Sequence, residues 1–371
     1  MKNQKYNLSE LIIFTPNIDH GGVEKNLFLL TNFLSKKFSK ISLITFNSSD
    51  KKYFNKKVEF ITPKIFNDYK NRLIKNLICS MILIKMIFFG KKKLIFSFNS
   101  NLYATILAKI FGAKIIIRIN ASHKLWAKNF IKKNIFKIFF KLPNKVIVNS
   151  IDLKKEIDKE FKIKSKCILN PLNKKKILEI KKNNKKLFGV NQKTLKILFL
   201  GRLVDQKDPF TFIKSIKKLP KELDFKALMI GSGYMKKNIL KYIKGNSLQK
   251  KINQIDFTPK AIQYLNQCDL FVLTSKFEGL PNVLLEAQFL KKYIISSNCP
   301  TGPREILLNG KAGDLIKMKN PKLLSQRIIN YYFNRKKNDY KRKIQLGFKR
   351  LNRYDFKTNC EKYFNLIKEL S

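Results

Sequence analysis

Short apolar runs alternate with longer stretches of helical periodicity along the whole chain. This alternation is typical of a doubly wound parallel sheet, in which helices cover the faces of buried strands. Because the pattern runs through two loosely similar halves, we expect an α/β protein with one such sheet in each half. The predicted strands are 11–15, 41–46, 58–61, 94–98, 114–119 and 145–149 in the first half, and 195–200, 226–230, 252–257, 270–274, 293–297 and 313–316 in the second.

One polar segment interrupts the alternation. Residues 174–194 are rich in lysine and asparagine and contain no apolar strand, so we predict a linker there. An N-terminal domain then covers residues 1–173 and a C-terminal domain covers residues 195–353. Residues 354–371 form a closing helix.

The 371 residues are enough for two domains with full cores, and a hydrophobic content of 44% excludes wholesale disorder. The formal net charge of +53 suggests a nucleic-acid-binding protein. However, the basic residues are spread through nearly every segment, and lysine greatly outnumbers arginine, as an AT-rich coding bias would produce. Such a surface is still attracted to anionic lipid, by about 1 kcal/mol for each basic residue near a membrane.

The cysteines and the N-terminus indicate a reduced, cytoplasmic protein. The five cysteines form no CxxC pair, and several lie in apolar runs where cysteine acts as a small hydrophobe. With only two histidines, we expect no zinc site. The polar N-terminus leads directly into the first strand, so we expect no signal peptide.

Two glutamates lie eight positions apart: Glu278 is in a glycine–proline turn, and Glu286 is about a turn and a half into the helix that this turn starts. The amides around Gly279 and Leu280 lie at a helix N-terminus, which favours anions. The carboxylates can accept hydrogen bonds from sugar hydroxyls beside such an anion. This combination suits a nucleotide sugar, and the alternative is an ordinary amphipathic helix with two solvated glutamates.

A second segment strengthens the first interpretation. The apolar run 195–200 ends at Gly201 and is followed by Arg202 and Lys207. Open α/β sheets bind ligands at the carboxyl ends of their strands, where these two cations would lie. Arginine can grip a phosphate with two parallel hydrogen bonds, and lysine acts as a point charge.

Together the segments resemble the family 4 glycosyltransferases, which are retaining enzymes with two Rossmann-like domains facing across a cleft (GT-B). The two segments that begin at Glu278 and at Cys299 are similar to the subgroup that builds bacterial surface polysaccharides and lipid-linked oligosaccharides. In the family's order they are Gly21-Gly22-Val23-Glu24, Asn170-Pro171, Gly201-Arg202 with Lys207, Gly231-Ser232-Gly233, Glu278-Gly279-Leu280-Pro281-Asn282 with Glu286-Ala287, and Cys299-Pro300-Thr301-Gly302-Pro303-Arg304-Glu305-Ile306.

The resemblance implies a hexosyl- or N-acetylhexosaminyltransferase. Its donor would be a nucleotide-diphosphate sugar, with UDP-sugar favoured, and its acceptor a glycan or polyprenyl-linked sugar. Arg202 and Lys207 would neutralise the leaving diphosphate, so no metal and no cofactor are expected. Glu286 would bind the ribose hydroxyls, and Glu278 would hold the donor sugar. The other donor-binding residues that it implies are Gly21, Gly22, Gly201, Gly233, Gly279, Leu280, Pro281 and Asn282. The closing helix would return to the first domain.

The first domain should also contact the donor sugar. Related enzymes carry a polar residue, often histidine, after the fifth strand. His123 is our candidate there, and Asn120 and His20 are alternatives.

Two segments mix lysine with large apolar residues, 71–93 and 125–141. Basic helices of this kind can lie in a membrane interface. The alternative for both is a core-facing helix whose polar positions coding bias has filled with lysine. We favour this alternative for the first segment, and for the second we favour a membrane contact that inserts Trp126, Phe136 and Phe140. The protein would then be peripheral at the inner face of the cell membrane.

Four rival interpretations remain. A nucleic-acid-binding protein would leave the ordered segments unexplained. A GT-B epimerase should have clustered histidines and acids, and a phosphorylase should have a pyridoxal lysine motif in a far longer chain. A degenerate, inactive transferase is disfavoured because Arg202, Lys207 and both glutamates are present.

Overall fold

The computed structural model describes residues 10–19, 21–64, 71–90, 94–123, 130–181, 187–191 and 193–371. The chain divides into two compact units. The first contains Met1–Pro171 together with Phe356–Ser371, and the second contains Leu172–Asp355.

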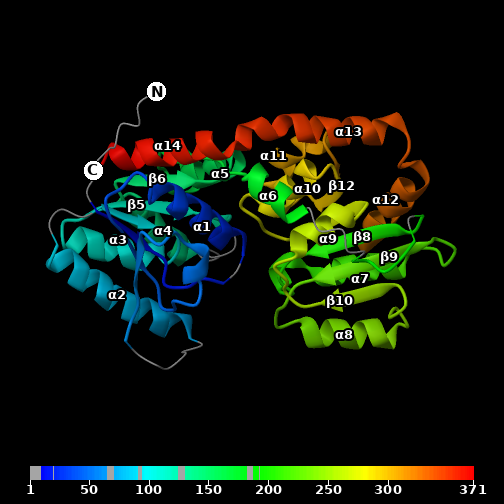
Figure 1. The fold of residues 1–371 in the computed structure, drawn as a ribbon, viewed down its shortest axis with the longest axis horizontal. Helices are drawn as coiled ribbons and strands as arrows, with labels where there is room; N and C mark the ends of the chain where they lie inside the picture. Colours follow the sequence, from blue (N-terminus) through cyan, green and yellow to red (C-terminus); the bar gives the residue numbers. More distant parts are fainter. Residues whose placement is uncertain are drawn as a thin grey trace. The chain divides into compact units, whose positions relative to one another are not determined.

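The first unit is built on a seven-stranded parallel sheet with the order β3-β2-β1-β4-β5-β6-β7 (Figure 1). Its strands are β1 (Leu11–Phe14), β2 (Ile41–Ile44), β3 (Val58–Ile61), β4 (Leu94–Ser97), β5 (Lys114–Ile119), β6 (Lys145–Val148) and β7 (Lys166–Cys167). Its helices are α1 (Gly22–Leu34), α2 (Arg72–Phe88), α3 (Asn101–Ile110), α4 (Phe130–Phe139), α5 (Ile151–Phe161) and α14 (Phe356–Lys368).

Two apolar clusters cover the two faces of this sheet. On one face, alternate strand residues pack against α2, α3, α4 and α5. On the other face, the remaining strand residues pack against α1 and α14, so the last helix of the chain completes the first unit. Because both faces are covered, the strands are continuous apolar runs.

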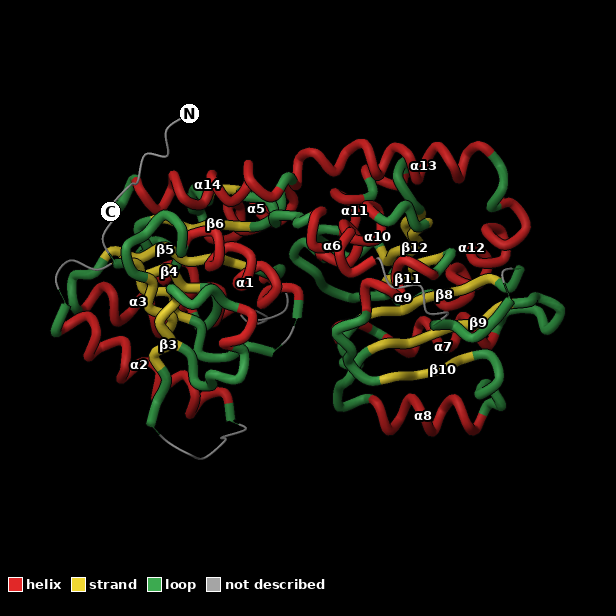
Figure 2. The backbone as a smooth tube through the Cα atoms, viewed as in Figure 1, coloured by secondary structure: helices red, strands yellow, loops and turns green. Residues whose placement is uncertain are grey.

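The second unit has a six-stranded parallel sheet with the order β10-β9-β8-β11-β12-β13 (Figure 2). Its strands are β8 (Leu195–Leu200), β9 (Phe225–Ile230), β10 (Ile252–Ile255), β11 (Leu270–Leu273), β12 (Tyr293–Ser297) and β13 (Asp314–Ile316). Its helices are α6 (Lys174–Lys181), α7 (Pro209–Lys217), α8 (Lys236–Gly245), α9 (Ala261–Gln267), α10 (Asn282–Phe289), α11 (Pro303–Ile306), α12 (Pro321–Asn334) and α13 (Asn338–Lys349).

The predicted fold class, two doubly wound α/β halves, is confirmed by these two parallel sheets. All twelve predicted strands are present with boundaries within two residues. The sequence missed β7, which has two residues and no apolar run. The predicted linker 174–194 is wrong in part, because α6 lies within it and Ile177 of that helix is buried in the second unit.

Candidate functional site

All neighbouring strands of the second sheet are parallel, so the loops that follow β8, β9, β11 and β12 emerge at one edge. This carboxyl edge is where open α/β sheets bind ligands. The predicted residues Arg202, Lys207 and Glu278 are in two of these loops. Their placement follows from the positions at which β8 and β11 end.

An ion pair joins the two loops. Lys207 Nζ lies 2.5 Å from Glu278 Oε1, and the two side chains are 16% and 8% exposed. Lys207 ends the short 3-10 helix η3 (Asp205–Lys207), and Thr274 Oγ1 donates to the Lys207 and Asp208 carbonyls at 2.9 and 2.8 Å. The ammonium therefore projects from a fixed backbone. The structure thus brings together two residues that are 71 positions apart in the sequence.

Asp208 fixes the turn that carries Lys207. Its backbone is left-handed, with φ of 46°, and its side chain caps α7 by accepting from the Thr211 amide at 3.3 Å. The Thr211 hydroxyl donates to the same carboxylate at 2.6 Å. The sequence analysis did not identify this role of Asp208 in placing Lys207.

Arg202 is exposed, in contrast to Lys207. Its Nη2 donates to Gln206 Oε1 at 3.3 Å, and Gln206 Nε2 donates to the Phe277 carbonyl at 2.9 Å. A second ion pair, between Lys276 Nζ and Asp205 Oδ1 at 2.5 Å, also connects the two loops. The 202–207 and 276–278 loops are thus held together by further contacts next to the Lys207–Glu278 pair.

Three glycines allow these loops to pack closely. A Cβ on Gly231 would lie 2.0 Å from the Gly201 carbonyl oxygen, and one on Gly233 would lie 2.3 Å from the Leu203 carbonyl oxygen. Gly302, with φ of 88°, approaches the Gly279 carbonyl so closely that a Cβ would lie 2.4 Å from it. Gly233 and Gly279 were predicted from the resemblance as donor-binding residues. In the structure, both take part in loop-to-loop packing beneath the site.

The Glu278 loop is also fixed by the loop that follows β12. The Thr301 hydroxyl donates to the Glu278 carbonyl, and Cys299 is buried nearby. Burial raises the pKa of the Cys299 thiol, and the Glu278 carboxylate raises it further. Thr301 and Gly302 carried the family resemblance but were assigned no role. Their sequence signal was the Thr-Gly-Pro turn.

Glu286 lies on α10, one to two turns beyond its start at Asn282. The proline of the predicted glycine–proline turn, Pro281, is the N-cap residue of this helix. Glu286 is 5% exposed and Leu280 is likewise 5% exposed, so both are largely covered. The solvated-glutamate alternative is therefore wrong for both Glu278 and Glu286.

In the first unit, Gly21 is the N-cap residue of α1, and the Glu24 carboxylate accepts a hydrogen bond from its amide at 2.8 Å. Gly22 is the first residue of that helix. His20, an alternative sugar contact, lies outside the described residues.

His123 does not lie free at the edge of the first sheet. Its Nδ1 is 2.7 Å from Glu156 Oε1, its Nε2 is 3.6 Å from Glu160 Oε2, and its side chain is 5% exposed. Its ring also packs edge-on against Phe161. Because both ring nitrogens face carboxylates of α5, these contacts favour a packing role for His123, and its catalytic role stays a prediction.

Asn120 is partly exposed at the carboxyl end of β5. Its side-chain amide donates to the Phe98 carbonyl at 2.7 Å, and its side-chain oxygen accepts from Arg118. Arg118 is itself 1% exposed and donates to Asn170 at 2.6 Å and to the Tyr363 hydroxyl of α14 at 2.9 Å. Of the two described candidates after the fifth strand, Asn120 is the more accessible to a sugar.

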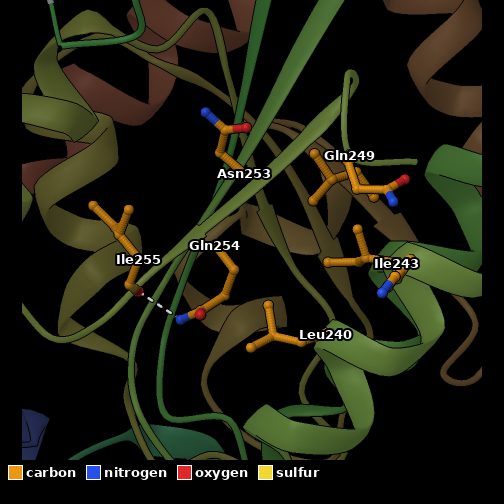
Figure 3. Close-up of a pocket in the computed structure, with 8 residues that line it drawn as sticks. Leu240, Ile243, Gln249, Asn253, Gln254 and Ile255 are labelled. Carbon is orange, nitrogen blue, oxygen red and sulfur yellow. Dashed lines mark hydrogen bonds between the residues drawn. The ribbon is translucent and has the colours of Figure 1, made fainter. Parts of the chain in front are cut away.

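A shallow groove of about 440 Å³ lies elsewhere, between α8 and the edge strand β10 (Figure 3). Its lining includes Leu240, Ile243, Asn253 and Gln254, and Gln254 donates to the Ile255 carbonyl at 2.7 Å. It contains neither a carboxylate nor any of the predicted site residues. Among the described residues, no cluster of three or more histidine, cysteine or acidic side chains could hold a metal ion.

Comparison with known proteins agrees with this geometry. The sequence pattern of the glycosyl transferases group 1 family matches residues 180–345, which contain the Lys207–Glu278 pair. An N-acetylgalactosaminyltransferase of Campylobacter jejuni, named for a diphospho-undecaprenol-linked acceptor, is 24% identical over 340 residues, covering 86% of this chain and 89% of that enzyme. The amylovoran biosynthesis glycosyltransferase AmsD of Erwinia amylovora is 26% identical, covering 80% of this chain and 83% of AmsD.

The fold is shared with solved structures. Anabaena HepE, crystallised with UDP and glucose, superposes with a TM-score of 0.78 at 15% identity, covering 97% of this chain and 99% of HepE. The two parallel sheets, the matched pattern in the second unit and these relatives lead to one assignment. They support a glycosyltransferase of the GT-B fold: the second unit matches the group 1 glycosyltransferases, and the chain is similar to enzymes of bacterial polysaccharide and lipid-linked sugar synthesis.

Proposed function

We propose that this glycosyltransferase moves a hexosyl or N-acetylhexosaminyl group from a UDP-sugar to a glycan or polyprenyl-linked acceptor, with retention of configuration. The observation that carries the proposal is the buried Lys207–Glu278 pair beside exposed Arg202, at the carboxyl edge of a parallel sheet. UDP is favoured because HepE was crystallised with UDP and glucose. The acceptor class is supported by the name of the C. jejuni relative.

The two cations act on the leaving group. As the bond from the anomeric carbon to the diphosphate oxygen breaks, negative charge grows on that oxygen. An ammonium has three donors, so Lys207 can keep its bond to Glu278 and still donate to a phosphate oxygen. Arg202 supplies a second, more exposed cation. Charges held in place before the reaction stabilise the transition state without reorganisation.

Glu278 acts on Lys207 rather than as a nucleophile. Its carboxylate is 8% exposed and is paired with an ammonium at 2.5 Å, which lowers its nucleophilicity. This favours attack by the acceptor hydroxyl on the face from which the diphosphate leaves. A new C–O bond then forms on that face, and the hydroxyl proton passes to the departing phosphate oxygen. Retention follows without a covalent sugar–enzyme intermediate.

We propose that no metal is needed, because Arg202 and Lys207 supply the positive charge that a divalent ion would otherwise provide. The test is to measure transfer in EDTA and then with added magnesium or manganese. Full activity in EDTA is expected. Activity that is lost in EDTA and restored by a divalent ion would contradict this part of the proposal.

We also propose that the protein works in the cytoplasm as a peripheral enzyme at the inner face of the cell membrane and has no nucleic-acid partner. None of the helices among the described residues is long and apolar enough to span a bilayer. A polyprenyl-linked acceptor is anchored in lipid, so an enzyme that uses one must reach the membrane surface. The net charge of +53 favours an anionic leaflet.

The function is tested in two steps. A thermal-shift screen of nucleotide sugars should show stabilisation by UDP-sugars, because a ligand that binds only the native state must stabilise it. The best donor is then incubated with polyprenyl-diphosphate-linked glycans, and the product is analysed by mass spectrometry and by NMR of the new anomeric centre. Stabilisation by no nucleotide sugar, or a product of inverted configuration, would contradict the proposal.

A further inference from the structure

Helix α2 of the first unit is apolar on the side that faces away from its sheet. Leu73, Leu77, Met81 and Phe88 recur at helical spacing along that side and are 59%, 57%, 69% and 71% exposed. The opposite side of the same helix packs Cys79, Leu83 and Ile87 into the core. A helix that covers a sheet normally turns polar residues to solvent. The interpretation of segment 71–93 as a core-facing helix therefore holds for its inner side, and it leaves the exposed apolar side unexplained.

The neighbouring helices share this property. On α3, Ile106 and Ile110 are 43% and 67% exposed. On α4, the exposed apolar residues Ile131, Ile135 and Ile138 recur every three to four residues along one side. Helices α2 and α3 pack side by side (Figure 2), and α2, α3 and α4 all cover the same face of the sheet. Their exposed apolar residues thus belong to one layer, which we call the α2–α4 layer.

The membrane contact predicted for 125–141 was assigned to the wrong side chains of α4. Phe140 is 4% exposed, and Phe136 stacks on it with ring centroids 5.5 Å apart, so both belong to the core. Trp126 lies outside the described residues. The apolar side chains of α4 that reach the surface are the isoleucines, which the sequence interpretation did not single out.

The charged side chains of the α2–α4 layer are all basic. The three helices contain seven basic residues and no aspartate or glutamate. Only two of the described ion pairs compensate them, Arg72 with Asp19 and Lys133 with Glu160. Helix α5, on the same face of the sheet, has four acidic residues in eleven positions. The absence of acids is thus a property of this layer and not of every surface helix.

We propose that the outer face of the α2–α4 layer docks on an anionic bilayer, with the apolar side chains at the boundary between headgroups and acyl chains. Exposed Lys85 and Lys109 would lie near the headgroup phosphates. Apolar insertion and electrostatic attraction together are the two signals that stable peripheral binding requires. This inference rests on the proposed function and adds the surface by which the enzyme reaches its acceptor.

A second copy of the chain fits the layer less well. A symmetric dimer through this face would place the same acid-free, basic helices against each other. Like charges brought together in this way repel, whereas an anionic leaflet neutralises them. The charge therefore selects lipid over self-association.

The test is co-sedimentation of the full chain with vesicles that contain phosphatidylglycerol in phosphatidylcholine at rising mole fraction. Wild type should bind more tightly as the anionic fraction rises and more weakly as salt rises. In the triple variant Leu77→Gln/Met81→Gln/Phe88→Gln, each side chain loses roughly a fivefold partition advantage, so binding should weaken by about 100-fold. The variant Ile131→Gln/Ile135→Gln/Ile138→Gln should weaken by a similar factor.

A matched control changes exposed apolar residues of the second unit. Leu178 and Phe333 are 48% and 69% exposed, and Leu178→Gln/Phe333→Gln should bind vesicles as wild type does. The charge variant Lys85→Gln/Lys109→Gln should lose about 25-fold at low salt and much less at high salt. Circular dichroism and the UDP-sugar thermal shift of each variant show that its fold and donor site are intact.

Three results would overturn the proposal. The first is wild-type vesicle binding by the α2 triple variant. The second is equal binding of wild type to neutral and anionic vesicles. The third is a wild-type dimer that the α2 variant converts to a monomer while neither protein sediments with vesicles. Sedimentation needs no catalysis, so its failure is distinguishable from a failure of the transferase assay.

Discussion

Replacing Lys207 by methionine isolates the charge at the centre of the proposed site. Methionine keeps an unbranched apolar stem where the Lys207 stem passes Gly201, at which a Cβ would lie 3.6 Å from Lys207 Cγ. The substitution removes the ammonium that lies 2.5 Å from Glu278 Oε1. The Glu278 carboxylate then stays in its covered position without this partner.

The expected loss of stability follows from the burial of this pair. Breaking a fully buried ion pair by removing one partner costs about 3–5 kcal/mol, because the other charge is left uncompensated. The Glu278 side chain is 8% exposed and Lys207 is 16% exposed, so we expect the lower end of that range, about 3 kcal/mol. For a unit of this size, that corresponds to a fall in melting temperature of roughly 6–12 °C.

The loss of activity has a different cause. Removal of one preorganised group that stabilises developing charge typically lowers kcat by about 10²–10³-fold. The double variant Lys207→Met/Glu278→Gln separates the two effects, because it leaves no unpaired charge. We expect it to regain most of the melting temperature while its kcat at saturating UDP-sugar stays low.

The assays are differential scanning calorimetry and steady-state transfer at saturating donor. A Lys207→Met protein with wild-type melting temperature would show that the ion pair does not stabilise the second unit. A double variant that recovers both stability and kcat would show that Lys207 only balances Glu278 and takes no part in the chemistry. Either result would refute the reasoning.

Three further predictions concern other parts of the molecule. In urea unfolding, Gly231→Ala should destabilise the second unit by more than about 3 kcal/mol, because its Cβ would lie 2.0 Å from the Gly201 carbonyl oxygen. The control Gly245→Ala, whose Cβ would meet no neighbouring atom within 4 Å, should be neutral or stabilising. His123→Gln should lower the melting temperature and leave kcat unchanged, because the ring is enclosed by Glu156 and Glu160; an unchanged melting temperature with a much lower kcat would support the catalytic role instead. Burial raises the pKa of Cys79 and Cys268 to about 12, so both thiols should resist thiol reagents at pH 8. Thiols of the unfolded chain ionise at a lower pH than these buried thiols, so the free energy of unfolding should fall as pH rises from about 9 to 12.

The strands could be predicted because a parallel strand covered on both faces is a continuous apolar run. β7 was missed because Lys166 and Cys167 form no such run. Helix α2 shows the opposite difficulty: both of its sides are apolar, so its composition could not tell which one meets the core. Only the packing of Cys79 and Leu83 decides that question.

The sequence identified residues that the structure brings together, but it could not predict the contacts between them. Arg202, Lys207 and Glu278 were identified from strand ends, a helix start and the family resemblance. The pairing of Lys207 with Glu278 spans 71 positions and depends on the order of β8 and β11 in the sheet. The burial of His123 likewise depends on Glu156 and Glu160, which are 33 and 37 positions away, so its apparent availability in the sequence was misleading.

Hydrogen–deuterium exchange with and without a UDP-sugar tests the central claim most directly, because it locates the donor on the chain. The account predicts that the donor slows exchange in residues 201–208 and 277–286, which contain Arg202, Lys207, Glu278 and Glu286. The groove between α8 and β10 should exchange at the same rate with and without donor. Protection confined to that groove, or unchanged exchange at both loops when the donor is saturating, would contradict the assignment of the Lys207–Glu278 site.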